Sequence, residues 1–76
     1  MRKIQICWHD MEDGVSHDAE IEIGDNDDAK VAGYDWFRNY IEACPGLKAA
    51  GAGILDIESI SEVVDGETKY HLAPWL

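Results

Sequence analysis

The chain has 76 residues and a formal net charge of -10, and 46% of its residues are hydrophobic. This length allows one domain over residues 1–76, and the apolar content excludes an intrinsically disordered acidic tail. The negative field repels nucleic acid and anionic membranes, which excludes both as direct partners, and it attracts basic proteins.

The beginning of the chain alternates apolar and polar side chains, so it lacks the continuous apolar core of a signal peptide. No stretch approaches the ~18 apolar residues of a membrane-spanning helix. We therefore expect a cytoplasmic protein in which Cys7 and Cys44 are reduced thiols rather than a disulfide.

The first half of the chain predicts a β-hairpin with strands near residues 2–10 and 17–24. Asp13-Gly14 is a strong signal for a two-residue type I′ turn, because that turn needs positive φ at both central positions. Pairing outward from this turn places the apolar residues of both strands on one face, as a half-buried strand pair requires. The opposed apolar pairs are Trp8–Ala19, Ile6–Ile21 and Ile4–Ile23. The other face opposes Gln5–Glu22, Cys7–Glu20 and His9–Asp18. A longer loop over residues 10–16 is the alternative.

Residues 27–43 predict an amphipathic helix that ends before Pro45-Gly46. Asp25 or Asn26 can cap it, and the acidic residues that follow suit its positive first turn. Arg38, on the polar side, lies between two acidic residues at helical spacing. The apolar side, at 3.6-residue periodicity, comprises Ala29, Gly33, Trp36, Phe37, Tyr40, Ile41 and Cys44.

The small residues at 45–53 predict a flexible connector, and a third strand follows over 53–64. Its alternation falters, because Leu55 and Ile57 share a face while Ile60 is out of phase with them. A bulge near residues 58–60, or burial on both faces, would explain this.

Asp65-Gly66 predicts a second two-residue turn, which places Glu62 opposite Lys69 and Ser61 opposite Tyr70. The last strand is expected over residues 69–73, before Pro74 limits further central pairing. Trp75 and Leu76 then fold back as an apolar plug, or Trp75 is offered to a partner, since exposed aromatic residues are favoured binding anchors.

The element order is strand, strand, helix, strand, strand, without internal repeats. This order predicts an α+β fold in which a four-stranded antiparallel sheet carries one helix on one face. The other face is left without a covering layer, so it is either solvated or an interface. A homodimer is a reasonable expectation, because domains below roughly 80 residues are often stabilised by association.

No motif in the chain carries recognisable catalytic chemistry, so we expect no enzyme, no cofactor and no dedicated metal site. Cys7 and His9 share a strand face, where His17, His71, Asp18 or Glu20 would have to complete a zinc site. Structural zinc sites normally show paired ligands at close spacing, and Asp18 serves equally well as a charge partner of His9.

The sequence gives little support for a catalytic thiol or for a calcium site. A catalytic thiol needs a partner base and a cleft, and the flat strand face around Cys7 offers no cleft, while Cys44 fits a buried apolar position. Residues 10–18 hold acids around a glycine but lack the spacing of an EF-hand. They allow weak adventitious divalent binding rather than a dedicated calcium site.

The most informative feature is a run of nine acidic residues, without Lys or Arg, between Lys3 and Lys30. A surface made only for solubility, or for a halophilic cytoplasm, is one explanation. However, such a surface would intersperse both signs, whereas this run lines one strand face and the start of the helix. The predicted partner-binding residues are Asp10, Glu12, Asp13, Asp18, Glu20, Glu22, Asp25, Asp27 and Asp28, together with Trp75.

The spacing of these acids suggests what they contact. Acidic residues two positions apart on one strand face lie roughly 6.6–7 Å apart. The phosphates of one DNA strand are spaced on a similar scale, at one charge per ~3.4 Å of helix axis. A row of carboxylates is therefore expected to occupy a Lys/Arg groove built for nucleic acid.

The segments RKIQICWHD, DAEIEIG, DDAKVAGYDWFRNYIEA, GILDIESISEVV and KYHLA resemble, in size and layout, the small acidic anti-CRISPR proteins encoded by phages. The resemblance covers the whole chain as an architecture and includes no signature motif. It implies a stoichiometric inhibitor in the bacterial cytoplasm that binds a CRISPR effector subunit and blocks DNA binding or nuclease recruitment. The alternative is a small structural or regulatory module that homodimerises through its open sheet face.

Overall fold

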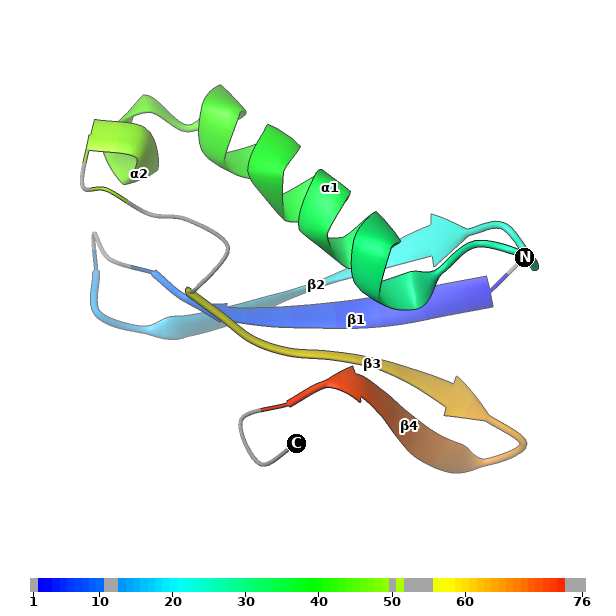
Figure 1. The fold of residues 1–76 in the computed structure, drawn as a ribbon. Helices are drawn as coiled ribbons and strands as arrows, with labels where there is room; N and C mark the ends of the chain where they lie inside the picture. The colour runs from blue at the N-terminus through cyan, green and yellow to red at the C-terminus, as the bar shows by residue number, and fades with distance from the viewer. Residues whose placement is uncertain (1, 11–12, 50, 52–55, 74–76) are drawn as a thin grey trace.

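The computed structural model describes residues 2–10, 13–49, 51 and 56–73 and shows an α+β fold (Figure 1). Four antiparallel strands form one sheet in the order β2-β1-β3-β4, so β2 and β4 are its edges. The strands are β1 (Arg2–His9), β2 (Ser16–Ile23), β3 (Ile57–Val64) and β4 (Glu67–Leu72). The helices α1 (Ala29–Ala43) and α2 (Pro45–Ala49) lie between β2 and β3 in the chain. The predicted α+β class and four-stranded antiparallel sheet are confirmed, whereas the prediction of one helix is wrong because α2 is also present.

Helix α1 crosses one face of the sheet and packs against β1, β3 and β4 (Figure 1). We call this the helix face and the opposite side the outer face. No helix among the described residues is long and apolar enough to cross a membrane. Cys7 and Cys44 are free thiols and half-buried.

The first hairpin pairs in a register that differs from the predicted one. Trp8 lies opposite His17, and Asp18 lies opposite Cys7, so the predicted pairs of this hairpin, His9–Asp18 among them, are wrong. The register is displaced by two residues along β2. Because side chains alternate with a period of two, this displacement leaves every side chain on its predicted face.

The loop at the tip of this hairpin accounts for the register. Asp10 donates its backbone N–H to the carbonyl of Val15 at 2.9 Å, and Gly14 donates to the carbonyl of Asp10 at 2.9 Å. The Asp13 carboxylate accepts the Val15 N–H at 2.8 Å. Of the two residues predicted to form the turn, Gly14 takes positive φ, at 70°, and Asp13 does not. The predicted two-residue turn is therefore wrong, and the longer loop that was its alternative is present.

Helix α1 begins two residues later than predicted because Asp28 caps it. The Asp28 carboxylate accepts the backbone N–H groups of Lys30 at 3.0 Å and Val31 at 3.1 Å, which satisfies donors that the first helical turn leaves unpaired. The prediction of Asp25 or Asn26 as the cap is wrong.

The segment predicted as a flexible connector contains α2 at its start. Pro45 opens this helix, a position where its missing N–H costs nothing, and Leu47 is buried at 3% exposure. Lys48 reaches back to α1, where its Nζ lies 2.8 Å from the Glu42 carboxylate. The prediction of a flexible connector is wrong for residues 45–49, because α2 occupies them and Leu47 is buried.

The second hairpin follows the prediction. Glu62 lies opposite Lys69, and the turn residues Asp65 and Gly66 have positive φ, at 52° and 79°. The bulge predicted near residues 58–60 is also present, because the register between β1 and β3 shifts there and leaves Glu58 without a partner on β1. Predictions that involve Leu55, Trp75 or Leu76 lie outside the described residues.

The core lies between α1 and the helix face of the sheet. Its centre is aromatic, with the Trp8 ring 5.6 Å from that of Phe37 and 5.2 Å from that of Tyr40. Helix and sheet approach closely at Gly33, where an added Cβ would lie 2.7 Å from Cδ1 of Ile60. The buried cluster comprises Ile4, Ile6, Trp8, Ile23, Ala29, Phe37, Ile41, Ile57 and Ile60.

Candidate functional site

The structure brings three of the predicted acidic residues together on the outer face of β2. Asp18, Glu20 and Glu22 alternate with helix-face residues along this edge strand, and all three are exposed. We call these three residues the acidic row. The pairing of β2 with β1 holds them on a common face, so folding fixes their spacing.

Two side chains of β1 form polar contacts with the acidic row. Gln5 donates a hydrogen bond from its amide nitrogen to the Asp18 carboxylate at 2.6 Å. The Nζ of Lys3 lies 3.9 Å from the Glu20 carboxylate, and both side chains are more than half exposed. An exposed ion pair at this distance contributes little energy, so it leaves the row available to a stronger cationic partner.

The acids that follow β2 hold the entry to α1. The Asp27 carboxylate accepts the Gly24 N–H at 2.7 Å, while Asp28 caps the helix. Arg2 clamps the same segment, donating to the backbone carbonyls of Asp27 at 2.8 Å and Asp25 at 3.3 Å. Asp25, Asp27 and Asp28 are exposed. The carboxylates of Asp27 and Asp28 also stabilise the fold through these hydrogen bonds, a role that the sequence pattern did not distinguish from partner binding.

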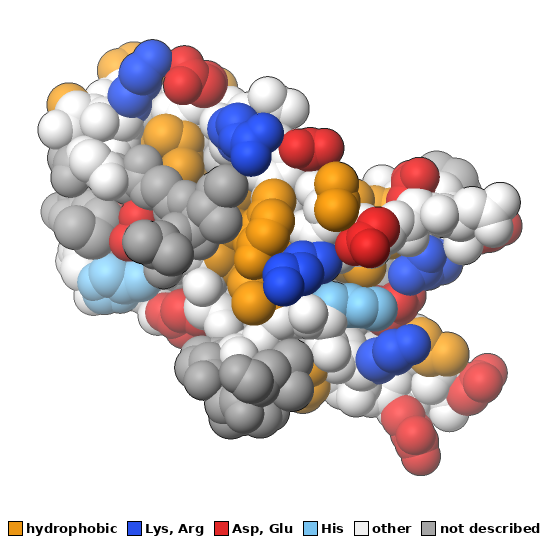
Figure 2. Space-filling view, viewed as in Figure 1, with side chains coloured by type: hydrophobic (Ala, Val, Ile, Leu, Met, Phe, Trp, Pro, Cys, Tyr) orange, Lys and Arg blue, Asp and Glu red, His pale blue; other side chains and the backbone are white. Residues whose placement is uncertain are grey.

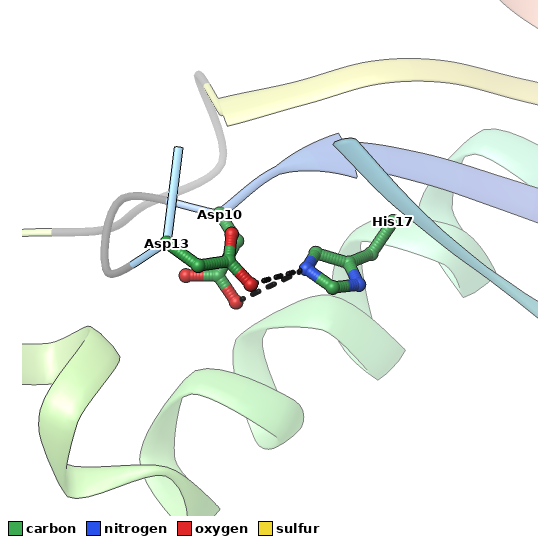
Figure 3. Close-up of side chains that lie close together, drawn as sticks. All are labelled: Asp10, Asp13 and His17. Carbon is green, nitrogen blue, oxygen red and sulfur yellow. Dashed lines mark hydrogen bonds and ion pairs between the residues drawn. The ribbon is translucent and has the colours of Figure 1, made fainter. Parts of the chain in front are cut away.

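Asp10 and Asp13 are not part of the acidic row. They lie at the tip of the first hairpin beside His17, as Figure 3 shows. The Nε2 atom of His17 is 2.8 Å from the Asp13 carboxylate and 3.7 Å from the Asp10 carboxylate. His17 lies opposite Trp8 on the helix face of the sheet, whereas the acidic row is on the outer face. We call Asp10, Asp13 and His17 the tip cluster.

The tip cluster has perturbed protonation. The hydrogen bond from the Val15 N–H, followed by that with His17, lowers the pKa of Asp13. The hydrogen bond with Asp13 raises the pKa of His17, and the charges of Asp10 and Asp18 add to this effect. The His17 ring also stacks on Trp8, with centroids 6.1 Å apart and planes inclined by 27°. The hydrogen bond with Asp13 and the stacking on Trp8 thus both orient the imidazole.

The tip cluster is the one group of potential metal ligands that the described part of the chain assembles, with ligand atoms within 4.8 Å of one another. Among the described residues, Cys7 and His9 do not belong to such a group, and His17 lies on the opposite face of the sheet from them. Sequence reasoning singled out residues 10–18 for weak divalent binding but did not join Asp10, Asp13 and His17 as one group. The available signal was the spacing of Asp10, Asp13 and His17 around a glycine.

A second charged network joins the two hairpins under the start of α1. The Arg2 guanidinium donates two hydrogen bonds to Glu62, at 2.7 and 3.1 Å, and His71 Nε2 lies 2.6 Å from the same carboxylate. The Glu62 side chain is only 6% exposed. The hydrogen bond from Arg2, with that of His71, lowers the pKa of Glu62 to about 2. This network fastens β1 to β3 and β4.

A comparison of the chain with protein-family models, curated proteins and solved structures finds no match. Glu12 and Trp75, which complete the predicted partner-binding set, lie outside the described residues.

Proposed function

We propose that this protein is a non-enzymatic inhibitor that binds a basic, nucleic-acid-handling protein through its acidic surface. The resemblance in layout points to a CRISPR effector subunit in the cytoplasm of a bacterial host, where the inhibitor blocks DNA binding or nuclease recruitment. The observation that carries the proposal is the acidic row, in which Asp18, Glu20 and Glu22 stand exposed on one face of an edge strand.

The spacing of the acidic row supports binding to a groove that normally holds phosphates. Successive carboxylates of the row start from positions roughly 6.6–7 Å apart on the strand. Lys and Arg side chains that contact one DNA strand bind phosphates whose spacing is on a similar scale. Because the sheet fixes the backbone of the row before binding, association requires ordering of side chains but not of the backbone. Opposite charges also speed the encounter.

The distribution of charge argues against solubility as the whole explanation. Basic and acidic side chains are interspersed over the side of the molecule seen in Figure 2, as in a generic soluble surface. The acidic row differs, since its ion pair with Lys3 is long, at 3.9 Å. Edge strands also use charge to prevent pairing with other sheets, and Lys serves that purpose as well as Glu does. Replacing the acidic row with Lys therefore preserves protection of the edge strand and removes only the contacts with a basic partner.

The test is capture of purified CRISPR effector complexes by the immobilised protein at stepped salt concentrations. We expect capture that weakens steeply as salt rises, because screening weakens attraction between exposed charges. The triple variant Asp18→Lys, Glu20→Lys, Glu22→Lys is expected to lose capture even at low salt. Failure to capture any effector, or capture that persists at high salt and in the variant, contradicts the proposal.

The matched control reverses three exposed acids away from the row. The triple variant Asp35→Lys, Glu42→Lys, Glu67→Lys changes the net charge by the same amount, with all three positions on α1 or at the start of β4. We expect this control to retain most of the capture. Equal losses in the two triple variants would show that net charge, rather than the acidic row, governs binding.

A second candidate function is a module that homodimerises through its outer face. Figure 1 shows α1 on the other side of the sheet, and the outer face exposes Val63 by 70% and Tyr70 by 42%. Sedimentation of the isolated protein tests this function. A dimer that dissociates in the variant Val63→Lys supports it, and a monomer at high concentration rules it out.

A further inference from the structure

We propose that the tip cluster binds a divalent first-row transition-metal ion, with Asp10, Asp13 and His17 as its protein ligands. The three side chains come from both ends of the hairpin loop and point toward one another (Figure 3). Their ligand atoms lie within 4.8 Å of one another. This site is separate from the acidic row, and its existence does not depend on the proposed function.

The distances suit a small tetrahedral ion. Zinc binds imidazole nitrogen and carboxylate oxygen at about 2.0–2.2 Å, which places tetrahedral ligand atoms roughly 3.3–3.6 Å apart. The Nε2 atom of His17 is 2.8 Å from Asp13 and 3.7 Å from Asp10, so these two separations lie on either side of that range, and all three ligand atoms lie within 4.8 Å of one another. Binding of the ion requires the distance from His17 to Asp13 to lengthen and that from His17 to Asp10 to shorten.

The chemistry of the ligands selects the class of ion. Calcium and magnesium prefer oxygen ligands alone, whereas an imidazole suits zinc and the neighbouring transition metals. Three protein ligands leave at least one coordination position for water, as in open zinc sites. Two carboxylates and a neutral imidazole also balance the charge of a divalent ion.

The ligands are held in place by groups outside the cluster. Asp13 directs one carboxylate oxygen to the Val15 N–H at 2.8 Å and the other to His17. The His17 ring lies against Trp8, which is itself 4% exposed and packed in the core. Asp10 is anchored by the two backbone hydrogen bonds that close the loop. Outer contacts of this kind orient metal ligands and strengthen binding.

The first experiment is calorimetric titration of the full-length, reduced protein with zinc chloride near neutral pH. We expect one tightly bound ion per chain and much weaker binding of magnesium and calcium. The variants Asp13→Asn and His17→Gln each remove one ligand. Loss of an outer partner alone typically weakens metal sites about 10- to 100-fold, so each variant is expected to weaken zinc binding by at least about 100-fold.

Matched controls use residues of the same types that lie near the tip but outside the cluster. His9→Gln, Asp18→Asn and Cys7→Ser alter side chains on the outer face, and zinc binding is expected to remain within about twofold of the natural protein. Retained binding in Asp13→Asn and His17→Gln, or loss in the outer-face controls, overturns the proposal. Circular dichroism of each variant establishes that the fold is intact.

A second measurement locates the ion without relying on variants. Manganese, added at substoichiometric concentration, broadens nuclear resonances near its binding site. We expect selective broadening of the Trp8 indole resonance and of the backbone amides of Asp13–His17. Broadening centred on Glu20 and Glu22, or spread evenly over the acidic residues, shows that the ion is held by surface charge and overturns the proposed site.

Discussion

The two hairpins share an Asp-Gly dipeptide yet turn differently. In the second, Asp65 and Gly66 both take left-handed φ values, and the strands pair directly outward from them. In the first, Gly14 is left-handed but Asp13 is not, and the Asp13 carboxylate instead bonds the Val15 N–H and His17. The comparison teaches that Asp-Gly permits a tight turn, while other hydrogen-bond partners of the Asp side chain decide whether it forms.

The two hairpins also differ in where their charged side chains lie. In the second hairpin, Glu62 is buried and bonded to Arg2 and His71, where it holds the strands together. In the first, Glu20 and Glu22 are exposed, and the tip cluster is half open to water. Charge therefore stabilises the fold through the second hairpin and faces outward from the first, which is where we place both proposed sites.

The largest expected effect compares the apolar contributions of the hairpins. Ile60 of the second hairpin is fully buried, whereas Ile21 of the first is half-buried. We expect Ile60→Ala to lower the free energy of unfolding by about 2–5 kcal/mol, and Ile21→Ala to cost about half as much, since less apolar area is lost. Urea denaturation of both variants measures this. Equal losses would mean that the first hairpin is as deeply packed as the second.

The turns themselves give the next largest difference. An added Cβ meets no atom within 4 Å at Gly66 or Gly14, so an alanine there is penalised only for its left-handed backbone, by about 1–2 kcal/mol. We expect the full penalty at Gly66, where the turn is tight, and a smaller one at Gly14, where the loop can adjust. Thermal unfolding measures both.

The control for the turns is asparagine, which tolerates the left-handed region better than alanine. Gly66→Asn and Gly14→Asn are expected to unfold close to the natural protein. A Gly14→Ala variant that is destabilised more than Gly66→Ala would contradict the interpretation of the first loop as the adjustable one.

The smallest expected effect is on the pH dependence of folding stability, to which Glu62 contributes by joining the two hairpins. Its pKa falls from 4.5 to about 2 on folding, so its stabilisation is complete above pH 4.5 and is lost as the pH falls toward 2. Water around the partly exposed Arg2 side chain moderates the effect. In Glu62→Gln, we expect the unfolding temperature to depend less on pH over this range than in the natural protein. If the unfolding temperatures of the variant and the natural protein changed with pH in the same way, Glu62 would not be the source of this pH dependence.

Side-chain alternation predicted the faces of the sheet well, because Ile4, Ile6 and Trp8 on β1 repeat with the period of a strand. It did not predict the register of the first hairpin, since a displacement by two residues leaves the same faces apolar. The tight turn at Asp65-Gly66 and the bulge at Glu58 were predicted because each leaves a local mark in the sequence.

Features that depend on tertiary contacts were harder to predict. Four residues near the start of α1 are able to cap it, and the sequence does not distinguish Asp28 from Asp25. Helix α2 buries Leu47, and this burial leaves no mark in a stretch of small residues. The acidic row was predicted from strand alternation, whereas the tip cluster was not, because the loop turns Asp10 and Asp13 toward the face of His17.

The most direct test of the account is competition between this protein and DNA for a CRISPR effector complex, measured by the fluorescence anisotropy of a labelled target duplex. The account predicts that the natural protein and the Asp35→Lys, Glu42→Lys, Glu67→Lys control displace the duplex. The variant Asp18→Lys, Glu20→Lys, Glu22→Lys is predicted to leave it bound. Displacement by all three proteins with equal potency, or by none of them, would contradict the claim that the acidic row binds where DNA does.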